Sequence, residues 1–334
     1  MILDSSYINS NRINQSRLKK ILIHPIFYRD YGHSEDDEPS EVLLIGDAVD
    51  MKLTQGDAKF EENFTVATVE RPSSKMGDFV WHLYLNRNHP QAEQIAYSAA
   101  EFSQDIKIVR KNFEEKGKAY YDQLIASEGK KVLTPSQFNT VNLIVKSFKE
   151  NPFTKEYFKE TEHIKIFKQV AIDFPWEYNG FTYDCKALLD MVIVDTLSGV
   201  IIPIDIKTTT TPLHFWADHF MKLRYDIQAA WYRKALMSHD LVHAFNIVSP
   251  FSQPEIKDFL FLVESQKYPG NPLIFEVDPS IINLALEGGV YKGNYYEGIY
   301  SAFDRLAFHN STDKWDYRKE DYENNGVRRI TCNP

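Results

Sequence analysis

Two aspartates and one lysine stand inside apolar runs near the middle of the chain. Asp190 precedes the run MVIV, and Asp205 and Lys207 lie within the run IIPIDIK. Side chains alternate along a strand, so Asp205 and Lys207 share one face, while Ile206 points the other way into a core. A buried charge is costly unless it is paired or bound to a metal. These three charges therefore need partners, and a divalent cation is one candidate.

A short turn, LSG at residues 197–199, separates the two runs. A hairpin there would pair the runs and could bring Asp190 near Asp205. Mg²⁺ commonly takes one or two carboxylates together with water and substrate phosphate. The two aspartates would supply these, with the Ile206 carbonyl as a third ligand and room for a second ion. The ion would lower the pKa of a bound water and polarise a phosphate ester, while Lys207 would orient that water and offset transition-state charge.

A simpler interpretation is that Asp190 caps a strand and that Asp205 and Lys207 form a structural salt bridge. The D-x-K triplet alone is weak, because it occurs by chance in most chains of this size. A following helix favours the catalytic interpretation. Gln228 and Tyr232 are four residues apart and share a helix face, where both could hydrogen-bond a phosphate or an attacking water. A glutamine and a tyrosine so placed are, however, also common at a core edge.

The flanking residues of this helix support the same orientation. Arg224 and Tyr225 lie on the side of Gln228 and Tyr232, while a separate apolar stripe, which includes Ile227, is available for packing. The helix is expected to span about residues 214–238.

The elements around this helix follow from hydrophobic periodicity and turn residues. The first half is expected to be mainly helical, with helices in the ranges 16–24, 41–55, 91–126 and 134–151. A three-stranded meander is expected from about residue 164 to residue 208. Further strands are expected at 243–249, 258–265 and 272–278, and a terminal helix at 279–308 that breaks at Gly288-Gly289.

Composition narrows the class of protein. Hydrophobic content of 43% and charged content of 25% are ordinary for a globular chain. Two cysteines, Cys185 and Cys332, exclude a disulfide framework and a four-cysteine metal site, and a reducing cytoplasm is expected. No apolar run approaches the ~20 residues of a membrane helix, and the first residues lack the order of a signal peptide. The net charge of −9 argues against a protein that coats nucleic acid non-specifically, but it allows a local basic groove that binds nucleic acid.

The motifs together resemble a known family. Asp190, then Asp205-Ile206-Lys207, then the Gln228–Tyr232 helix resemble the PD-(D/E)xK superfamily, specifically its RecB-like branch with a Q-x-x-x-Y helix. The likeness is nearest to RecE-type (exodeoxyribonuclease VIII-like) nucleases of phages and prophages. Weaker matches follow in the family's order, so the resemblance is nearly end to end; they lie at 16–28, 133–152, 185–190, 259–279 and 314–317.

The resemblance implies a restriction-endonuclease-like α/β core, with a central mixed sheet flanked by helices and a largely helical N-terminal half. It implies a single nuclease domain over residues 1–334, in which 1–160 is mainly helical, 161–278 carries the catalytic sheet and the Q-x-x-x-Y helix, and 279–334 forms the C-terminal helix and tail. The implied activity is that of a Mg²⁺- or Mn²⁺-dependent DNA exonuclease, acting on linear duplex DNA in phage recombination or replication.

Partners and contacts are implied in the same way. A homo-oligomer is implied, a phage single-strand annealing protein is a partner to consider, and the bacterial cytoplasm is the expected location. The expected nucleic-acid contacts are Lys186, Thr208, Arg224 and Tyr225.

The chain departs from the family pattern at two points. The family carries a Gly-x-x-x-His motif whose histidine binds metal, whereas the corresponding segment here runs from Gly46 to Asp50. Asp50 would replace that histidine as a ligand, since a carboxylate suits a hard cation; Asp47 and Glu162 are rival third acids. The second departure is a Leu-Leu pair at 188–189, where the family often has Arg-Pro, and there Lys186 would have to supply the phosphate contact.

Two alternatives stay open at this point. An endonuclease or a single-strand-specific nuclease would use the same core and the same chemistry. A catalytically inactive relative that binds nucleic acid or a protein is suggested by Asp50 and by the acidic composition, although the retained Asp190, Asp205 and Lys207 argue against it.

Overall fold

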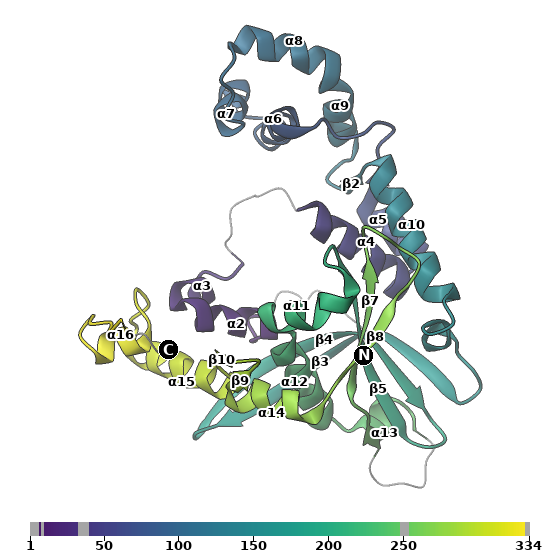
Figure 1. The fold of residues 1–334 in the computed structure, drawn as a ribbon, viewed down its shortest axis with the longest axis vertical. Helices are drawn as coiled ribbons and strands as arrows, with labels where there is room; N and C mark the ends of the chain where they lie inside the picture. Colours follow the sequence, from purple (N-terminus) through teal and green to yellow (C-terminus); the bar gives the residue numbers. More distant parts are fainter. Residues whose placement is uncertain (1–6, 8–9, 33–39, 248–253, 331–334) are drawn as a thin grey trace.

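A six-stranded mixed sheet forms the centre of the protein, and helices flank it (Figure 1). The computed structural model describes residues 7, 10–32, 40–247 and 254–330. The strand order is β3-β4-β5-β7-β8, with β6 paired to β5. Neighbours are antiparallel except that β5 is parallel to both β6 and β7. The strands are β3 Ile164–Tyr178, β4 Phe181–Asp195, β5 Val200–Thr209, β6 Glu255–Ile256, β7 Phe259–Ser265 and β8 Leu273–Val277. This confirms the predicted mixed α/β core.

The first three strands form the predicted meander. Tyr178 pairs with Phe181 across a two-residue turn of Asn179 and Gly180, whose φ angles are 49° and 78°. Positive φ at both positions gives a turn whose twist matches the flanking strands, which is why Asn-Gly is favoured there. The turn between β4 and β5 follows Asp195, which accepts a hydrogen bond from the Ser198 hydroxyl at 2.7 Å.

Each face of the sheet has its own core. One face packs against α2, α11, α12, α14 and α15, and we call its buried side chains the α12-side core. The other face packs against α4 and α10, and we call its buried side chains the α4-side core. The helices concerned are α2 Gln15–Ile23, α4 Glu41–Thr54, α10 Pro135–Glu150, α11 Trp216–Lys222, α12 Tyr225–Met237, α14 Pro279–Glu287 and α15 Ile299–Thr312.

A separate group of helices lies at the top of Figure 1, beyond the sheet, and has two small cores of its own. We call it the helical lobe; its helices are α6 Ser74–Leu85, α7 Ala92–Ala99, α8 Ile106–Lys116 and α9 Lys118–Ala126. The lobe is joined to the sheet through α10 and a parallel pair, β1 Phe64–Val66 with β2 Lys131–Leu133. Further short helices of this half are α3 Pro25–Arg29, α5 Asp57–Asn63 and the 3₁₀ helix η1 Lys155–Phe158. The helical prediction for 91–126 is confirmed, whereas α6 and the two short strands were not predicted.

The helix α10 begins where its sequence predicts. Thr134 is the N-cap, and with Gln137 it forms a reciprocal capping box. This arrangement satisfies two backbone donors that the first turn would otherwise leave unpaired.

Replacing Thr134 by alanine is expected to lower the free energy of unfolding by about 1 kcal/mol, because the Gln137 N–H loses its acceptor. Denaturant unfolding would measure the change, with Thr140→Ala, at a half-buried threonine within the same helix whose hydroxyl donates to the Ser136 carbonyl, as the matched control. A loss no larger at Thr134 than at Thr140 would contradict the cap assignment.

The first helix, α2, ends at Ile23 as expected, and Pro25 then occupies the first turn of α3, a position that needs no backbone N–H. Two expectations need correction. The helix expected at 214–238 is two helices, because Arg224 adopts φ 56° and a right-handed helix cannot continue through that conformation. Leu241–Ala244 is a short helix, α13, where the strand expected at 243–249 should begin; residues 248 and 249 lie outside the described part.

The break expected at Gly288-Gly289 is confirmed, and a hairpin fills it. Strands β9 Gly289–Tyr291 and β10 Asn294–Tyr296 pair there, between α14 and α15. Gly288 has φ 83°, and an added Cβ would lie 3.0 Å from the Tyr296 carbonyl oxygen, so the close approach requires glycine.

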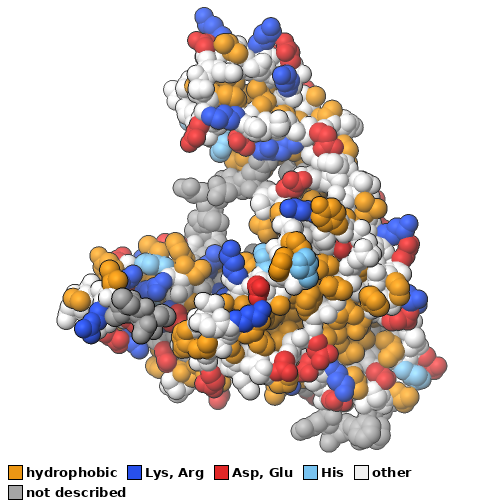
Figure 2. All heavy atoms as spheres, viewed as in Figure 1, with side chains coloured by type: hydrophobic (Ala, Val, Ile, Leu, Met, Phe, Trp, Pro, Cys, Tyr) orange, Lys and Arg blue, Asp and Glu red, His pale blue; other side chains and the backbone are white. Residues whose placement is uncertain are grey.

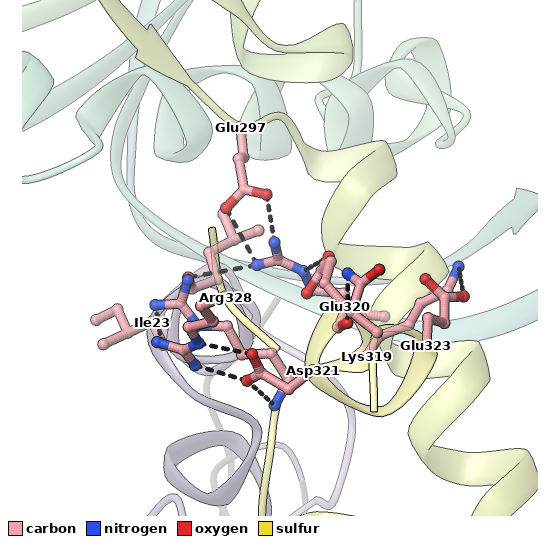
Figure 3. Close-up of polar contacts among 11 residues, drawn as sticks. Ile23, Glu297, Lys319, Glu320, Asp321, Glu323 and Arg328 are labelled. Carbon is pink, nitrogen blue, oxygen red and sulfur yellow. Dashed lines mark hydrogen bonds and ion pairs between the residues drawn. The ribbon is translucent and has the colours of Figure 1, made fainter. Parts of the chain in front are cut away.

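Hydrogen bonds join the C-terminal region to α2, beside ion pairs within that region (Figure 3). The buried Arg305 pairs with Glu297 and donates through Nε to Glu320 at 3.0 Å. Arg318 donates to the Ile23 carbonyl at 2.8 Å. A buried guanidinium needs such partners, so this network positions α2 relative to α15 and α16 Lys319–Glu323.

Within the described ranges, no helix has the length and apolarity required to cross a membrane. Basic and acidic side chains are interspersed on the face drawn in Figure 2.

Candidate functional site

Asp190 lies where strand pairing is interrupted on both sides of β4. Between β3 and β4, Lys168 pairs with Met191 and Val170 with Leu189. Asp190 has no partner on β3, because the opposing residue, Gln169, has φ 50°. The β4–β5 ladder covers Met191–Asp195 and so does not include Asp190 either. That register places Asp190 opposite Asp205, as the turn between the strands predicts.

The released Asp190 side chain replaces a ladder hydrogen bond. Its Oδ2 accepts the Ile206 N–H at 2.9 Å. The N–H and C=O of a strand residue point toward the same neighbour, so the Ile206 carbonyl faces the same edge of β5 as the carboxylate. Two oxygens from adjacent strands are thereby presented side by side.

Asp205 and Lys207 form an ion pair on the face of β5 that packs against α12. Asp205 is 1% exposed, and its Oδ2 contacts Lys207 Nζ. Its Oδ1 accepts a hydrogen bond from Gln228 Nε2. The Lys207 ammonium also lies 5.1 Å from the centre of the Tyr225 ring. As expected, Ile206 points the opposite way, into the α4-side core.

Helix α4 brings a third carboxylate, Asp50. A Cβ added to Gly46 would lie 3.3 Å from Thr208 Oγ1, so glycine lets this helix approach β5 closely. Asp50 Oδ2 accepts a hydrogen bond from Gln169 Nε2 at 3.4 Å. Asp50 Oδ1 is buried and has no hydrogen-bond partner among the described residues.

Electrostatics reflect this crowding of acids. Burial, and then the Asp205 charge, raise the pKa of Asp50 from 3.8 to about 6. Burial, and then Asp205 and Asp50, raise the pKa of Asp190 well above its usual range. Burial lowers the pKa of Lys207, but attraction to Asp205 and Asp190 outweighs it and raises that pKa above its ordinary value. The carboxylates thus lack sufficient positive charge when Lys207 is their only close cation.

A pocket of about 350 Å³ opens onto these groups. The predicted residues that line it are Asp50, Asp190, Ile206, Lys207, Thr208 and Tyr225. Asp205 lies behind the wall, where Lys207 and Gln228 cover it.

Other predicted residues lie elsewhere. Gln228 and Tyr232 are buried and do not line the pocket; Gln228 points at Asp205, and burial, then the charges of Asp205 and Asp190, raise the pKa of the Tyr232 hydroxyl. The expectation that both would face a phosphate or a water is therefore wrong for this arrangement. The reason is that their shared helix face packs against the sheet, where Gln228 holds Asp205.

Lys186 and Arg224 are also engaged away from the pocket. Lys186 is buried and donates to the carbonyls of Tyr7 at 2.9 Å and Ser10 at 3.0 Å. Arg224 forms an ion pair with Asp226 and donates to the Glu297 carbonyl. Lys186 therefore does not replace the family's phosphate contact, because the N-terminal segment takes its ammonium.

The rival third acids differ in position. Asp47 lines the pocket but is paired with Lys131 at 2.7 Å. The Glu162 side chain is 89% exposed and lies beside His163. Asp50 is thus the acid best placed to join Asp190 and Asp205.

Two further residues join the site that the motifs did not assign. Gln169 holds Asp50 and, at 3.0 Å, Thr54; no sequence signal marks it. Lys19 on α2 lies 6.0 Å from the Tyr225 ring centre, and burial, then repulsion from Lys207, lower its pKa to about 8. Lys19 belongs to the segment 16–28 that resembles the family's opening helix, and this match could have identified it.

The donors suit a hard divalent cation. As they stand, no three His, Cys, Asp or Glu side chains in the described part of the chain converge closely enough to hold a metal ion. Three observations nevertheless fit one: the unpartnered buried oxygen of Asp50, the raised pKa values of Asp50 and Asp190, and an all-oxygen donor set with the Ile206 carbonyl. Lys207 supplies one positive charge beside Asp205, and a bound divalent cation would supply a second.

No model of a known protein family matches this chain, and no curated protein matches it. Among solved structures, it is similar to one described as a "putative exonuclease" from Eubacterium rectale, with 15% identity over 99% of this chain and 96% of that chain and a TM-score of 0.50. At that identity the likeness shows a shared fold alone. The structure of SSO0001 is 12% identical over 74% of this chain and 84% of that chain, but its TM-score of 0.24 supports no argument.

Proposed function

We propose that this protein is a divalent-metal-dependent nuclease that hydrolyses DNA phosphodiester bonds. The observation that carries the proposal is that Asp50, Asp190 and Lys207, from three elements, line one pocket open to solvent, with Asp205 paired to Lys207 behind the pocket wall. A structural salt bridge would need only one acid beside Lys207. Here two further carboxylates, Asp50 and Asp190, are present, and burial and the Asp205 charge raise the pKa of each.

The residues divide into ligands and positioning groups. Asp190, Asp205 and the Ile206 carbonyl would hold Mg²⁺ or Mn²⁺, with Asp50 as a further ligand. The bound ion would supply an acidified water and charge stabilisation for the phosphate. Gln228 fixes the rotamer of Asp205. Gln169 fixes Asp50 in the same way.

The cations at the pocket would act on the substrate. Lys207 reaches both the carboxylates and the pocket, so its ammonium can orient the attacking water or offset charge on the phosphate. Lys19 stands close enough to feel the Lys207 charge and would add a second phosphate contact. Thr208 and Tyr225 line the same pocket and are proposed to contact the nucleic acid.

Within this class we propose a RecE-type exonuclease acting on linear duplex DNA in phage recombination or replication, in the bacterial cytoplasm. The support is the ordered set of motifs, together with the shared fold of the Eubacterium rectale structure. A homo-oligomer, partnership with a phage single-strand annealing protein and the single-domain boundaries remain proposals on the same basis.

The test is release of nucleotides from linear duplex DNA with Mg²⁺, Mn²⁺ or a chelator. We expect release that needs the ion and a free DNA end, so a closed circular duplex should survive. Cleavage of the circle would favour the endonuclease alternative, and cleavage of single strands alone would favour the single-strand-specific one. Folded protein that is inert with every substrate and ion would overturn the proposal in favour of an inactive binding relative.

A further inference from the structure

A second pocket, of about 370 Å³, lies between the helical lobe and the first turn of α4. We call it the aromatic pocket; its lining includes Arg71, Trp81, Tyr84, Tyr120, Lys130 and Lys131. None of the family motifs lies in α6 or α9, which supply its aromatic wall. Its chemistry therefore needs a separate explanation.

The lining of the aromatic pocket includes a cation, Lys130, that forms no salt bridge among the described residues, whereas Arg71 and Lys131 are paired with Asp78 and Asp47. This lining carries three cations and one acid, Glu41, although the chain as a whole carries −9. Lys130 donates to the neutral Glu61 carbonyl at 2.9 Å, and no carboxylate of the described residues forms a salt bridge with it. Its charge is thus available to an anion such as a phosphate.

The wall combines stacking surface with an unused donor. The rings of Trp81 and Tyr84 lie 5.7 Å apart at an interplanar angle of 37°. Trp81 Nε1 is buried and has no acceptor in the described part of the chain, a condition that calls for an explanation in a native structure. Aromatic rings beside cations are the combination that holds single-stranded nucleic acid, because every base has a π-face and every nucleotide a phosphate.

The position of the aromatic pocket relates it to the candidate site. Leu44 lines the aromatic pocket, while Asp47 and Asp50, farther along the same helix, line the pocket of the candidate site. A helix rises ~1.5 Å per residue, so Leu44 and Asp50 lie roughly 9 Å apart along α4. Lys131 of the aromatic pocket also pairs with Asp47 at 2.7 Å, so the two pockets share one wall.

We propose that the aromatic pocket holds an unstacked base of the same nucleic-acid strand whose phosphate occupies the candidate site. At about 3.4 Å per stacked nucleotide, the separation corresponds to roughly two to three nucleotides. Trp81 and Tyr84 contact the base, and Lys130 contacts its phosphate. This inference rests on the proposed function, because it takes the substrate to be a nucleic-acid strand.

The experiment is fluorescence anisotropy of a labelled single-stranded oligonucleotide of about ten nucleotides, with chelator present so that hydrolysis does not intervene. Trp81→Leu is expected to raise Kd roughly five- to hundredfold, because a stacking platform is lost. An oligonucleotide of the same length with abasic positions should bind the native protein weakly. Its Kd for Trp81→Leu should equal its Kd for the native protein. Tyr121→Leu is the matched control, since Tyr121 packs in the same lobe core without lining the pocket.

A second variant protects the test against misfolding of Trp81→Leu. Lys130 is exposed, so Lys130→Gln should fold, and it is expected to reduce the slope of log K against log salt by about one. The aromatic pocket is not the base site if the oligonucleotide binds, both variants have the Kd and salt dependence of the native protein, and the abasic strand binds as tightly as the intact one.

Hydrolysis assays separate this inference from the proposed function. Native protein that cleaves DNA, with Trp81→Leu binding and cleaving equally well, would overturn the inference alone. Suppose instead that the native protein binds the oligonucleotide through its bases, that Trp81→Leu does not, and that the native protein cleaves no DNA. That result would support the inference and overturn the proposed function. Protein that neither binds nor cleaves would overturn both.

Discussion

Asp190→Asn is expected to lower the rate of DNA hydrolysis by roughly 10²- to 10³-fold or more, while the protein stays folded. Asparagine keeps the shape of the side chain and can still accept the Ile206 N–H that Asp190 now accepts at 2.9 Å. It lacks the charge that a divalent cation requires from its ligands. Because burial, Asp205 and Asp50 all oppose ionisation of Asp190, removing its charge should not destabilise the metal-free protein.

The measurement is nucleotide release from linear duplex DNA at saturating Mg²⁺, with a thermal melt of each variant. Asp195→Asn is the matched control, since Asp195 is the last residue of the same strand and its carboxylate accepts from Ser198 in the turn before β5. Its activity should remain within a fewfold of the native value. An Asp190→Asn protein that keeps more than about a tenth of the native rate would remove Asp190 from the catalytic group.

Asp50→Asn is expected to stabilise the metal-free protein at neutral pH and to weaken its response to Mn²⁺. Burial, and then Asp205, raise the pKa of Asp50 from 3.8 to about 6. The folded state thus binds this proton more tightly than the unfolded state. The contribution of Asp50 to stability is therefore greatest below about pH 4, and it falls as the pH rises through about 6. Above that range the ionised group costs on the order of 3 kcal/mol.

Melting temperatures with and without Mn²⁺, at pH 5 and at pH 7.5, would measure both effects. The native protein should gain more from Mn²⁺ at the higher pH, because the ion competes with protons for the carboxylates. Asp50→Asn should melt a few degrees higher without the ion and gain less with it. Asp47→Asn, on the same helix but exposed and paired with Lys131, should change little. A lower metal-free melting temperature for Asp50→Asn would contradict the raised pKa of Asp50, and an undiminished gain with Mn²⁺ would contradict its assignment as a ligand.

The sequence predicted those parts of the fold that depend on neighbouring residues. The alternation that puts Asp205 and Lys207 on one face of β5 is confirmed. The meander predicted from about residue 164 is confirmed with its Asn-Gly turn, and the helix predicted at 134–151 begins after the Thr134 cap. Turns, caps and strand alternation are set by backbone chemistry within a few residues, so they can be read without the rest of the chain. The register that places Asp190 opposite Asp205 follows from one short turn for the same reason.

What the sequence could not supply is the orientation of one element against another. Helical periodicity placed Gln228 and Tyr232 on one face, but only packing turned that face toward Asp205 instead of toward the pocket. Lys186 sits beside the first acid in sequence, yet carbonyls about 180 residues earlier take its ammonium.

By itself, then, the chain determined a mixed α/β fold and a local group of acids and a lysine on two adjacent strands. Only the tertiary structure released Asp190 from its ladders, brought Asp50 to the same pocket and Lys19 near Tyr225 and Lys207, and placed the aromatic pocket beside that pocket. The physical reason is that contacts between distant segments are selected by the packing of whole elements, in which many small van der Waals terms act together and no single residue decides the outcome.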